Sequence, residues 1–398
     1  MIAARTYAYY RDALRGRRLP CAFVDLELLL TNARSVAGRA AGRPVRVASK
    51  SVRSVGILRR VFAADAAFRG VMCYSASEAV FLARQGFDDL LVAYPVVDAG
   101  EVESVCGAIA SGTRVVLTVD HVDQVARLAA VARERNVPLP LCLDVDMSSE
   151  FPGLHFGVRR SPIVDAAGAL AVARAIAAHP HLRLDGVLGY EAQIAGVPDA
   201  APARPLRSAI VRLLKSRSAR DVVKRRTTVV AALRSEGFDL RFVNGGGTGS
   251  LESTAADPSV TEATAGSGFY APSLFDGYRR FRHQPAAGFA IGITRIPGPG
   301  LYTCHGGGYV ASGAAGPDKL PAPYLPTGAR LLAAEGAGEV QTPIAYDGPE
   351  PLGIGDPIFL RHAKAGELCE RFNALLLVEG GRVVDEIATY RGDGQCFL

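Results

Sequence analysis

The chain has 398 residues, with 45 lysine and arginine residues against 39 aspartate and glutamate residues. Apolar residues make up 49% of it and charged residues 21%, which excludes an intrinsically disordered chain. The length favours two or three domains. No apolar run is long enough to span a membrane, and the first residues lack the apolar core of a signal peptide. We therefore expect a cytoplasmic protein without membrane contact.

Lysine is scarce, which makes each lysine informative. Only five of the 45 cations are lysine, and the other 40 are arginine. Lysine can lose its proton and act as a nucleophile, which arginine practically cannot. A lysine in an apolar or glycine-rich setting is therefore a candidate for chemistry. The five are Lys50, Lys215, Lys224, Lys319 and Lys364.

The positive charge is concentrated in one stretch. Residues 204–226 hold nine cations and one acid, which leaves 36 cations against 38 acids elsewhere. Residues 201–236 contain no aromatic side chain that could stack on a base. We therefore interpret the stretch as a solvated helix face and expect no nucleic-acid partner.

Up to about residue 270, short runs rich in β-branched residues alternate with longer segments of helical spacing. Parallel strands need a crossover, usually a helix, so this alternation predicts a parallel sheet. Eight or nine such units favour an α/β fold, a (β/α)8 TIM-type barrel, over an open sheet. We expect strands at 21–26, 45–49, 70–75, 89–95, 114–120, 139–146, 184–190, 240–246 and 261–268, and helices at 54–64, 75–86, 121–136 and 165–179.

The sequence changes character after about residue 275. Helical periods disappear, Gly and Pro separate short apolar runs, and Glu379-Gly-Gly-Arg382 predicts a hairpin turn. We therefore divide the chain into a barrel over residues 1–275 and a mainly antiparallel β domain over residues 276–398. Because nine runs exceed the eight that a barrel needs, the first 25 residues or so could instead pack with the β domain.

Lys50 directly follows the second run, VRVAS. The C-terminal ends of barrel strands form the active face, so we expect Lys50 to point into the barrel mouth. Burial among apolar side chains there would lower its pKa and favour the neutral amine, which can form an imine. The alternative is a strand-end lysine that reaches solvent.

Two glycine-rich loops follow the last two predicted strands. Gly245, Gly246, Gly247 and Thr248 belong to the first loop, and Gly266-Ser267 to the second. Backbone N–H groups of successive glycines, helped by hydroxyl groups, can surround an anion, and barrels commonly bind phosphates at these positions. A glycine run also forms tight turns, so each loop alone is weak evidence.

An imine-forming lysine and a phosphate cradle on opposite sides of a barrel mouth are what pyridoxal phosphate needs. In these features the chain resembles the alanine-racemase-like, fold-type III pyridoxal-phosphate enzymes, and within them the D-threonine aldolase and D-serine dehydratase group. The resemblance extends from PCAFVDLELLLTNARSV to GIGDPIFLRHAKAGELCERFN. It implies that Lys50 carries the cofactor and that Gly245–Thr248 bind its phosphate.

The resemblance weakens near the C-terminus. The group holds a divalent metal with a His-x-Cys or His-x-Asp pair, but here His362 is followed by Lys364, and an ammonium group cannot bind a cation. One interpretation completes a metal site at the histidine with Glu367, Cys369 or Glu370. The favoured one is a metal-free acid–base pair of His362 and Lys364 that acts on a β-hydroxyl group. A surface pair of Lys364 with Glu367 is the structural alternative.

Two further residues are weaker candidates. His155 follows the sixth run, near where related enzymes place an arginine, and could contact the cofactor ring or only pack. Tyr190 ends the seventh run and could bind the cofactor or cover the substrate.

These features predict a homodimeric pyridoxal-phosphate lyase that acts on a β-hydroxy-α-amino acid of D configuration. Cleavage of its Cα–Cβ bond would give an amino acid and an aldehyde. Dehydration to a keto acid and ammonia is the first alternative, and it gains more from a metal than aldol cleavage does. A racemase or decarboxylase would need a second base, such as a tyrosine of the β domain. A non-catalytic pyridoxal-phosphate-binding protein would resemble the barrel alone.

Overall fold

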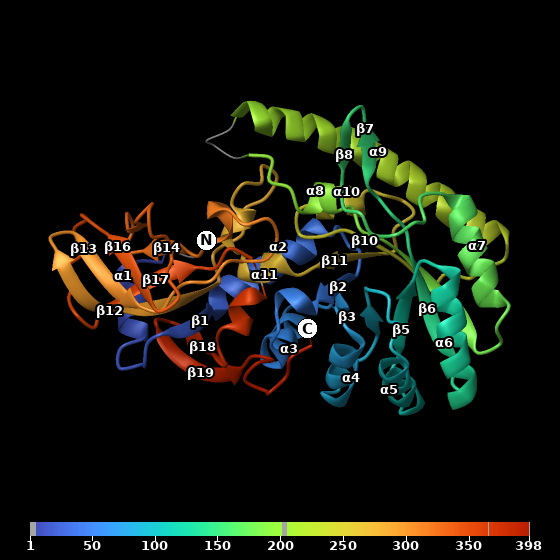
Figure 1. Ribbon diagram of the computed structural model, residues 1–398, viewed down its shortest axis with the longest axis horizontal. Helices are drawn as coiled ribbons and strands as arrows, with labels where there is room; N and C mark the ends of the chain where they lie inside the picture. The colour runs from blue at the N-terminus through green and yellow to red at the C-terminus, as the bar shows by residue number, and fades with distance from the viewer. Residues whose placement is uncertain (1–4, 201–204, 365, 398) are drawn as a thin grey trace.

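The computed structural model describes residues 5–200, 205–364 and 366–397. Eight parallel strands close into a barrel in the order β10-β11-β2-β3-β4-β5-β6-β9 (Figure 1). The predicted (β/α)8 barrel is therefore confirmed, and its strands coincide with the eight predicted runs after the first. They are β2 (Val45–Ala48), β3 (Phe68–Cys73), β4 (Leu90–Val92), β5 (Val115–Val119), β6 (Leu139–Asp144), β9 (Leu182–Gly189), β10 (Phe242–Gly245) and β11 (Glu262–Ala265).

Helices connect the barrel strands on the outside. Ser75, Asp98 and Asp165 each accept a backbone N–H of the first turn, which fixes where three of these helices begin. The helices are α2 (Leu26–Arg39), α3 (Val55–Ala64), α4 (Ala76–Arg84), α5 (Ala99–Ala110), α6 (Val122–Arg135), α7 (Ala166–Ala177), α8 (Ala192–Ala195), α9 (Pro205–Ser235), α10 (Leu251–Ala255) and α11 (Ser267–Tyr270). A short hairpin, β7 (Ser149–Phe151) and β8 (Leu154–Phe156), projects beside α9 (Figure 1).

The barrel interior is filled by apolar side chains from alternate positions of its strands. Leu91, Val116, Cys142, Leu188 and Phe242 form one buried cluster there. Packing of this kind makes the interior a core and not a channel, so the cavity of such a barrel lies at the C-terminal ends of the strands.

The second part of the molecule is a nine-stranded, mostly antiparallel sheet. Its first strand, β1, comes from the start of the chain and lies between β12 and β18, parallel to β18. β18 and β19 form the hairpin predicted at 379–382. The strands are β1 (Cys21–Asp25), β12 (Ala287–Gly298), β13 (Leu301–His305), β14 (Ala322–Leu325), β15 (Arg330–Leu331), β16 (Gln341–Ala345), β17 (Pro357–Arg361), β18 (Ala374–Glu379) and β19 (Arg382–Ala388).

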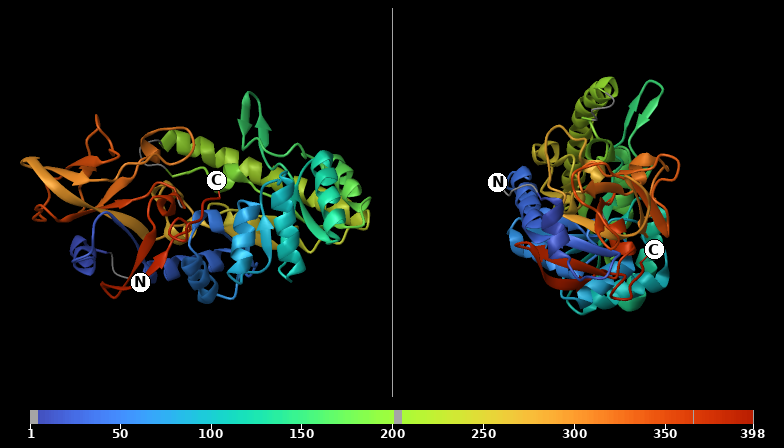
Figure 2. Two further views of the ribbon diagram at one scale, coloured as in Figure 1. Left: turned by 60° about the horizontal axis from the view of Figure 1, so that its bottom comes forward. Right: turned by 90° about the vertical axis from the view of Figure 1, so that its left-hand side faces the viewer.

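The barrel and the sheet lie end to end along the long axis of the molecule (Figure 2). The chain begins with α1 (Tyr7–Ala13) and β1 on the sheet side, passes into the barrel through α2, and returns to the sheet at β12. In the part of the chain that the structure describes, no helix combines the length and the apolar character that a membrane crossing requires.

The basic stretch forms much of α9, but two of its cations are buried. Arg226 is only 1% exposed and Lys215 only 8%. Arg226 forms ion pairs with Glu191 and Asp257, and Lys215 pairs with Asp199. The interpretation of this stretch as a solvated helix face is therefore wrong for these residues, because acids from distant segments make their burial possible.

Candidate active site

Lys50 lies in a short 3-10 turn, Ser49–Ser51, at the C-terminal end of β2. Its Nζ donates a hydrogen bond of 3.0 Å to the hydroxyl of Tyr94, which follows β4. The Lys50 side chain is exposed, so the expected burial among apolar residues is wrong. The Tyr94 hydroxyl is thus a polar neighbour of the Lys50 amine at the barrel mouth.

Tyr94 stands between two cations. The Lys50 ammonium and the Arg160 guanidinium lie 5.6 Å and 5.5 Å from the centre of its ring. Burial opposes ionisation of the phenol, but these positive charges outweigh burial and lower the pKa of Tyr94. Tyr94 is thus a stronger acid than a free phenol and can share a proton with the Lys50 amine.

Arg160 and Asp144 lie at the same end of the barrel and are not among the predicted site residues. Arg160 also faces the ring of Tyr190, at 5.4 Å. Asp144 ends β6, and burial raises its pKa to about 7, with Arg160 opposing the shift and Asp120 and Asp146 adding to it. The sequence signal that could have identified Asp144 was its position at the C-terminal end of a barrel strand.

The C-terminal segment of the β domain is held against the Lys50 turn. Gly366 has φ +89°, and a Cβ atom there would lie 1.9 Å from the carbonyl oxygen of Lys50, so only glycine fits. Arg53 donates to the same carbonyl at 3.0 Å and forms an ion pair with Glu370. These contacts bring residues more than 300 positions apart together at the mouth.

Lys364 belongs to this segment and is half-buried. Its Nζ donates to the hydroxyl of Ser312 at 2.8 Å, and Glu367 accepts the Ser312 N–H at 2.9 Å. Within the described residues Lys364 and Glu367 form no direct ion pair, so the expected surface pair is not present. Partial burial lowers the pKa of Lys364; Glu367 opposes this, while Lys50 and Lys319 add to it.

His362 is completely buried, two residues before Lys364. Burial lowers the pKa of its imidazole to about 3, with Arg361 acting in the same direction, so the ring is neutral near pH 7. Its ring lies edge-on to Tyr270, with centroids 6.2 Å apart. Both ring nitrogens lack a hydrogen-bond partner among the described residues, and neither His362 nor Lys364 lines the cavity that lies between Lys50 and the two glycine loops.

The proposed metal ligands are turned toward different partners. Glu370 pairs with Arg53, Glu367 binds Ser312, and the Cys369 thiol donates to the carbonyl of Val52. Among residues 5–200, 205–364 and 366–397, no three His, Cys, Asp or Glu side chains converge as a metal site requires. The donor set around His362 therefore does not fit a metal ion.

A cavity of about 140 Å³ extends from Lys50 to the two glycine loops. Predicted residues that line it are Lys50, Tyr190, Gly246, Gly247, Thr248, Gly266 and Ser267. Gly245 lies outside this lining, because it packs on Arg226 at the end of β10. The structure thus joins most of the predicted cofactor residues in one cavity.

The glycine-loop end of the cavity fits a phosphate group. Side chains cannot replace hydrogen at Gly247 or Gly266, since a Cβ atom would come within 2.9 Å of Ala195 and 2.8 Å of Ser51. The N–H groups of Gly246 and Gly247 do not face the cavity as expected; they bind Glu191 and Ser250, at 3.0 Å and 3.1 Å. The donors at this end include the hydroxyls of Ser51, Thr248 and Ser267. With an amine at the other end, this donor set fits pyridoxal phosphate.

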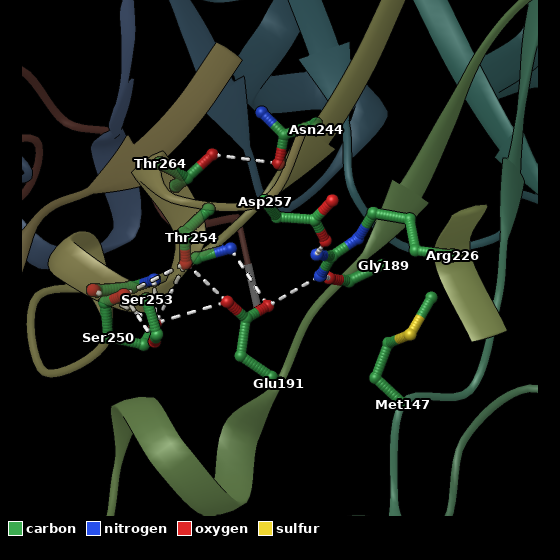
Figure 3. Close-up of polar contacts among 12 residues, drawn as sticks. Met147, Gly189, Glu191, Arg226, Asn244, Ser250, Ser253, Thr254, Asp257 and Thr264 are labelled. Carbon is green, nitrogen blue, oxygen red and sulfur yellow. Dashed lines mark hydrogen bonds and ion pairs between the residues drawn. The ribbon is translucent and has the colours of Figure 1, made fainter. Parts of the chain in front are cut away.

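A buried charge network supports the glycine loop from below (Figure 3). Glu191 accepts hydrogen bonds from Gly246 N–H at 3.0 Å and from the hydroxyls of Ser250 and Thr254. Arg226 of α9 donates to the same carboxylate at 3.0 Å and to the Gly189 carbonyl at 2.8 Å. Asp257 accepts a hydrogen bond from the other terminal nitrogen, Nη1, of the Arg226 guanidinium. The loop conformation is therefore fixed by an ion pair that is shielded from water.

His155 does not reach the cavity. It lies on β8 of the projecting hairpin, and its Nδ1 faces Glu150. The chain turns back after this hairpin, and Arg160 lines the cavity in its place. The expected contact of His155 with the cofactor ring is therefore not supported.

None of the tyrosines considered as a second base lines the cavity within the described residues. Tyr309 and Tyr390 are buried elsewhere, Tyr390 beside Glu78. A racemase or decarboxylase mechanism that uses a tyrosine of the same subunit finds no support in this arrangement. The tyrosines are Tyr302, Tyr309, Tyr324, Tyr346 and Tyr390.

Comparison with known proteins assigns the family. The family "Alanine racemase, N-terminal domain" matches residues 24–273, and the chain belongs to this family. It is a fold-type III protein, and the family implies pyridoxal phosphate as cofactor. The resemblance inferred from the sequence is thereby confirmed.

Two curated relatives are similar to part of this chain. A 3-hydroxy-D-aspartate aldolase of Paracoccus denitrificans (strain Pd 1222) is 27% identical over 58% of this chain and 54% of the relative. A D-threonine aldolase of an Arthrobacter species is 25% identical over 54% of this chain and 52% of the relative. The alignments span about half the length of these relatives.

Solved structures share the fold along nearly the whole chain. A D-threonine aldolase from Filomicrobium marinum has a TM-score of 0.79 at 19% identity and covers 94% of this chain and 95% of its own. A D-threo-3-hydroxyaspartate dehydratase from a Delftia species has a TM-score of 0.76 at 19% identity and covers 95% of this chain and 99% of its own. At this identity the likeness establishes the fold.

Proposed function

We propose that the protein is a homodimeric, pyridoxal-phosphate-dependent lyase that cleaves the Cα–Cβ bond of a D-β-hydroxy-α-amino acid. The products are an amino acid and an aldehyde. The observation that carries this proposal is the single cavity with the Lys50 amine at one end and a hydroxyl-rich glycine loop at the other. The names of the relatives, which are aldolases of D-threonine and 3-hydroxy-D-aspartate, support the substrate class.

The barrel residues hold and orient the cofactor. Lys50 would hold the cofactor through its aldehyde group, and Ser51, Thr248 and Ser267 would hold its phosphate. Arg160 and Tyr190 lie along the wall between the two ends. When bound, pyridoxal phosphate supplies an electron sink that stabilises negative charge at Cα.

The β-domain segment supplies the base for the β-hydroxyl group. Lys364, whose pKa is lowered, accepts the hydroxyl proton, and Ser312 orients its amine. The O–H electron pair then forms the aldehyde C=O bond, and the Cα–Cβ pair remains on Cα. His362, predicted as the acid–base partner of Lys364, is completely buried and outside the cavity, so in this proposal Lys364 alone is the base. Lys50 and Tyr94, which share a hydrogen bond, return a proton to Cα.

The test is product analysis with purified protein and D-threonine, 3-hydroxy-D-aspartate and D-serine, with the L enantiomers as controls. Aldehyde and keto acid are assayed in parallel, with and without chelator. We expect aldehyde plus glycine from the D substrates, unaffected by chelator. Keto acid and ammonia without aldehyde would instead identify a dehydratase.

A cofactor control completes this test. Lys50→Ala should abolish both the imine absorbance and the activity, because the amine that binds the cofactor carbonyl is gone. An absorbance that survives in this variant would contradict the assignment of Lys50. Size-exclusion chromatography with light scattering tests the homodimer.

A further inference from the structure

We propose that a second cavity, on the outer side of the first glycine loop, binds a small organic phosphate. It has a volume of about 480 Å³, within the range of small-molecule sites. Its wall comes from α8, α9, the start of α10 and the loop before β12. Four cations line it: Arg212, Lys215, Arg279 and Arg280.

The two acids of this cavity are already engaged. Asp199 accepts a hydrogen bond of 3.2 Å from Lys215 Nζ and one of 2.9 Å from the backbone N–H of Arg279. Glu252 is bound at 2.7 Å and 3.0 Å by Arg39, which is not among the lining residues. Neither acid is therefore free to neutralise the remaining guanidinium groups.

The charge balance favours a dianion. Four lining cations against two lining acids leave a formal charge of +2, and the pairing of Glu252 with Arg39 from outside the lining adds to this positive excess. A phosphate monoester carries about −1.5 to −2 near pH 7, which matches this excess, whereas a monocarboxylate carries half as much. Arg279 and Arg280 are exposed, and no ion pair of their side chains is found among the described residues. Guanidinium groups bind phosphate oxygens in bidentate geometry.

The deep part of the cavity is fixed by packing. Lys215 is 8% exposed, and its Nζ lies 4.7 Å from the centre of the Tyr278 ring. Ile194 and Ala219 add apolar surface, while Ser216 adds a hydroxyl group. Apolar surface beside a cationic rim fits an organic phosphate better than a bare inorganic anion.

This cavity is separate from the cofactor cavity. Gly246–Thr248 line the cofactor cavity. Gly249, Ser250 and Ser253, which come next in the chain, line the second cavity. The glycine loop therefore forms a wall between the two. The site also gives a role to two of the nine cations of the basic stretch, Arg212 and Lys215 of α9.

The test is isothermal titration of the cofactor-loaded protein with glycerol 3-phosphate, with glycerol and citrate as comparison ligands at matched ionic strength. Loading with cofactor keeps the first phosphate cradle filled. We expect saturable binding of one glycerol 3-phosphate per chain, no binding of glycerol, and weaker binding of citrate. No saturable binding, or equal binding of citrate, would overturn the proposal.

Variants locate the binding site. The double change Arg279→Gln and Arg280→Gln should weaken glycerol 3-phosphate binding at least tenfold, whereas Arg217→Gln, on the exposed face of α9, should leave it unchanged. Equal affinity in the double variant would place the ligand elsewhere and refute the site. Because no turnover is measured, failure of the proposed lyase reaction would not alter these results.

Discussion

Two buried glutamates show how differently the two ends of the cofactor cavity are built. Glu191, under the glycine loop, is paired with Arg226 at 3.0 Å and accepts hydrogen bonds from the loop. Glu78, beside the Lys50 turn, accepts the Tyr74 N–H at 2.8 Å and has no ion pair among the described residues. Burial raises the pKa of Glu78 to about 7, although Ser49, Tyr74, Tyr390 and Arg53 partly oppose it.

The difference follows from what each end must do. In the proposed reaction the glycine-loop end only binds the phosphate, so a buried charge network can fix its geometry. The Lys50 end moves protons in that reaction, and there the structure has an exposed amine, a phenol of lowered pKa and a buried carboxyl group whose pKa is raised to about 7. Variants at the two ends test this contrast.

Removing the proposed base should affect catalysis and not stability. Lys364→Met is expected to lower kcat by about 10²- to 10⁴-fold, the usual contribution of general acid–base catalysis. Its unfolding free energy should change by less than about 0.5 kcal/mol, because the side chain is only half-buried. Steady-state kinetics and urea denaturation check both values. Lys319→Met is the matched control, and an equal loss of kcat in that variant would argue for a general charge effect.

Breaking the ion pair at the phosphate end should mainly affect stability. Arg226→Met leaves Glu191 and Asp257 buried without a countercharge, which should cost about 3–5 kcal/mol of unfolding free energy and weaken cofactor binding. Urea denaturation and cofactor titration measure these effects. Lys224→Met, on the exposed side of the same helix, should stay within about 0.5 kcal/mol of the native protein. A similar small change at Arg226 would refute the supporting role of the network.

Glu78 should make the protein less stable as pH rises. Its folded pKa of about 7 lies above the ordinary value of 4.5, so the folded state retains a proton that the unfolded state releases. Its contribution is therefore fully present below pH 4.5 and lost as pH rises to about 7, by up to about 3 kcal/mol. Glu78→Gln removes this term. The stability difference between the variant and the native protein should grow over that interval in urea denaturation; a constant difference would contradict the assignment.

The hydrogen bond between Tyr94 and Lys50 should have the smallest effect. Tyr94→Phe removes one exposed hydrogen bond, worth up to about 1 kcal/mol, so kcat should fall up to about fivefold and the unfolding free energy by no more than about 1 kcal/mol. The pH–rate profile should also shift, because Lys50 loses its proton-sharing partner. If the rate falls but the profile stays fixed, Tyr94 only packs beside the lysine.

Much of the fold and part of the site could be predicted from local patterns. Eight strand-like runs predicted the barrel, and the rule that strand ends carry function identified Lys50, Gly247 and Ser267 before any contact was known. Of the two alternatives for His155 the structure favours packing away from the cavity, because His155 lies on a hairpin of three-residue strands without clear periodicity and Arg160 lines the cavity in its place. Tyr94 was missed since an aromatic residue after a strand is an unspecific signal.

The sequence by itself determined the barrel and placed Lys50 and the glycine loops at the ends of its strands, because backbone periodicity and glycine requirements are local properties. Only the tertiary structure decided how charges are partnered. Arg226 meets Glu191 across 35 positions, and Arg53 meets Glu370 across 317. Such pairs leave no periodic trace in a chain, since they depend on which distant segments the fold brings together. For the same reason the basic stretch is not the single solvated helix face that was predicted. Its Arg226 is buried under the glycine loop, and its Arg212 and Lys215 line a cavity.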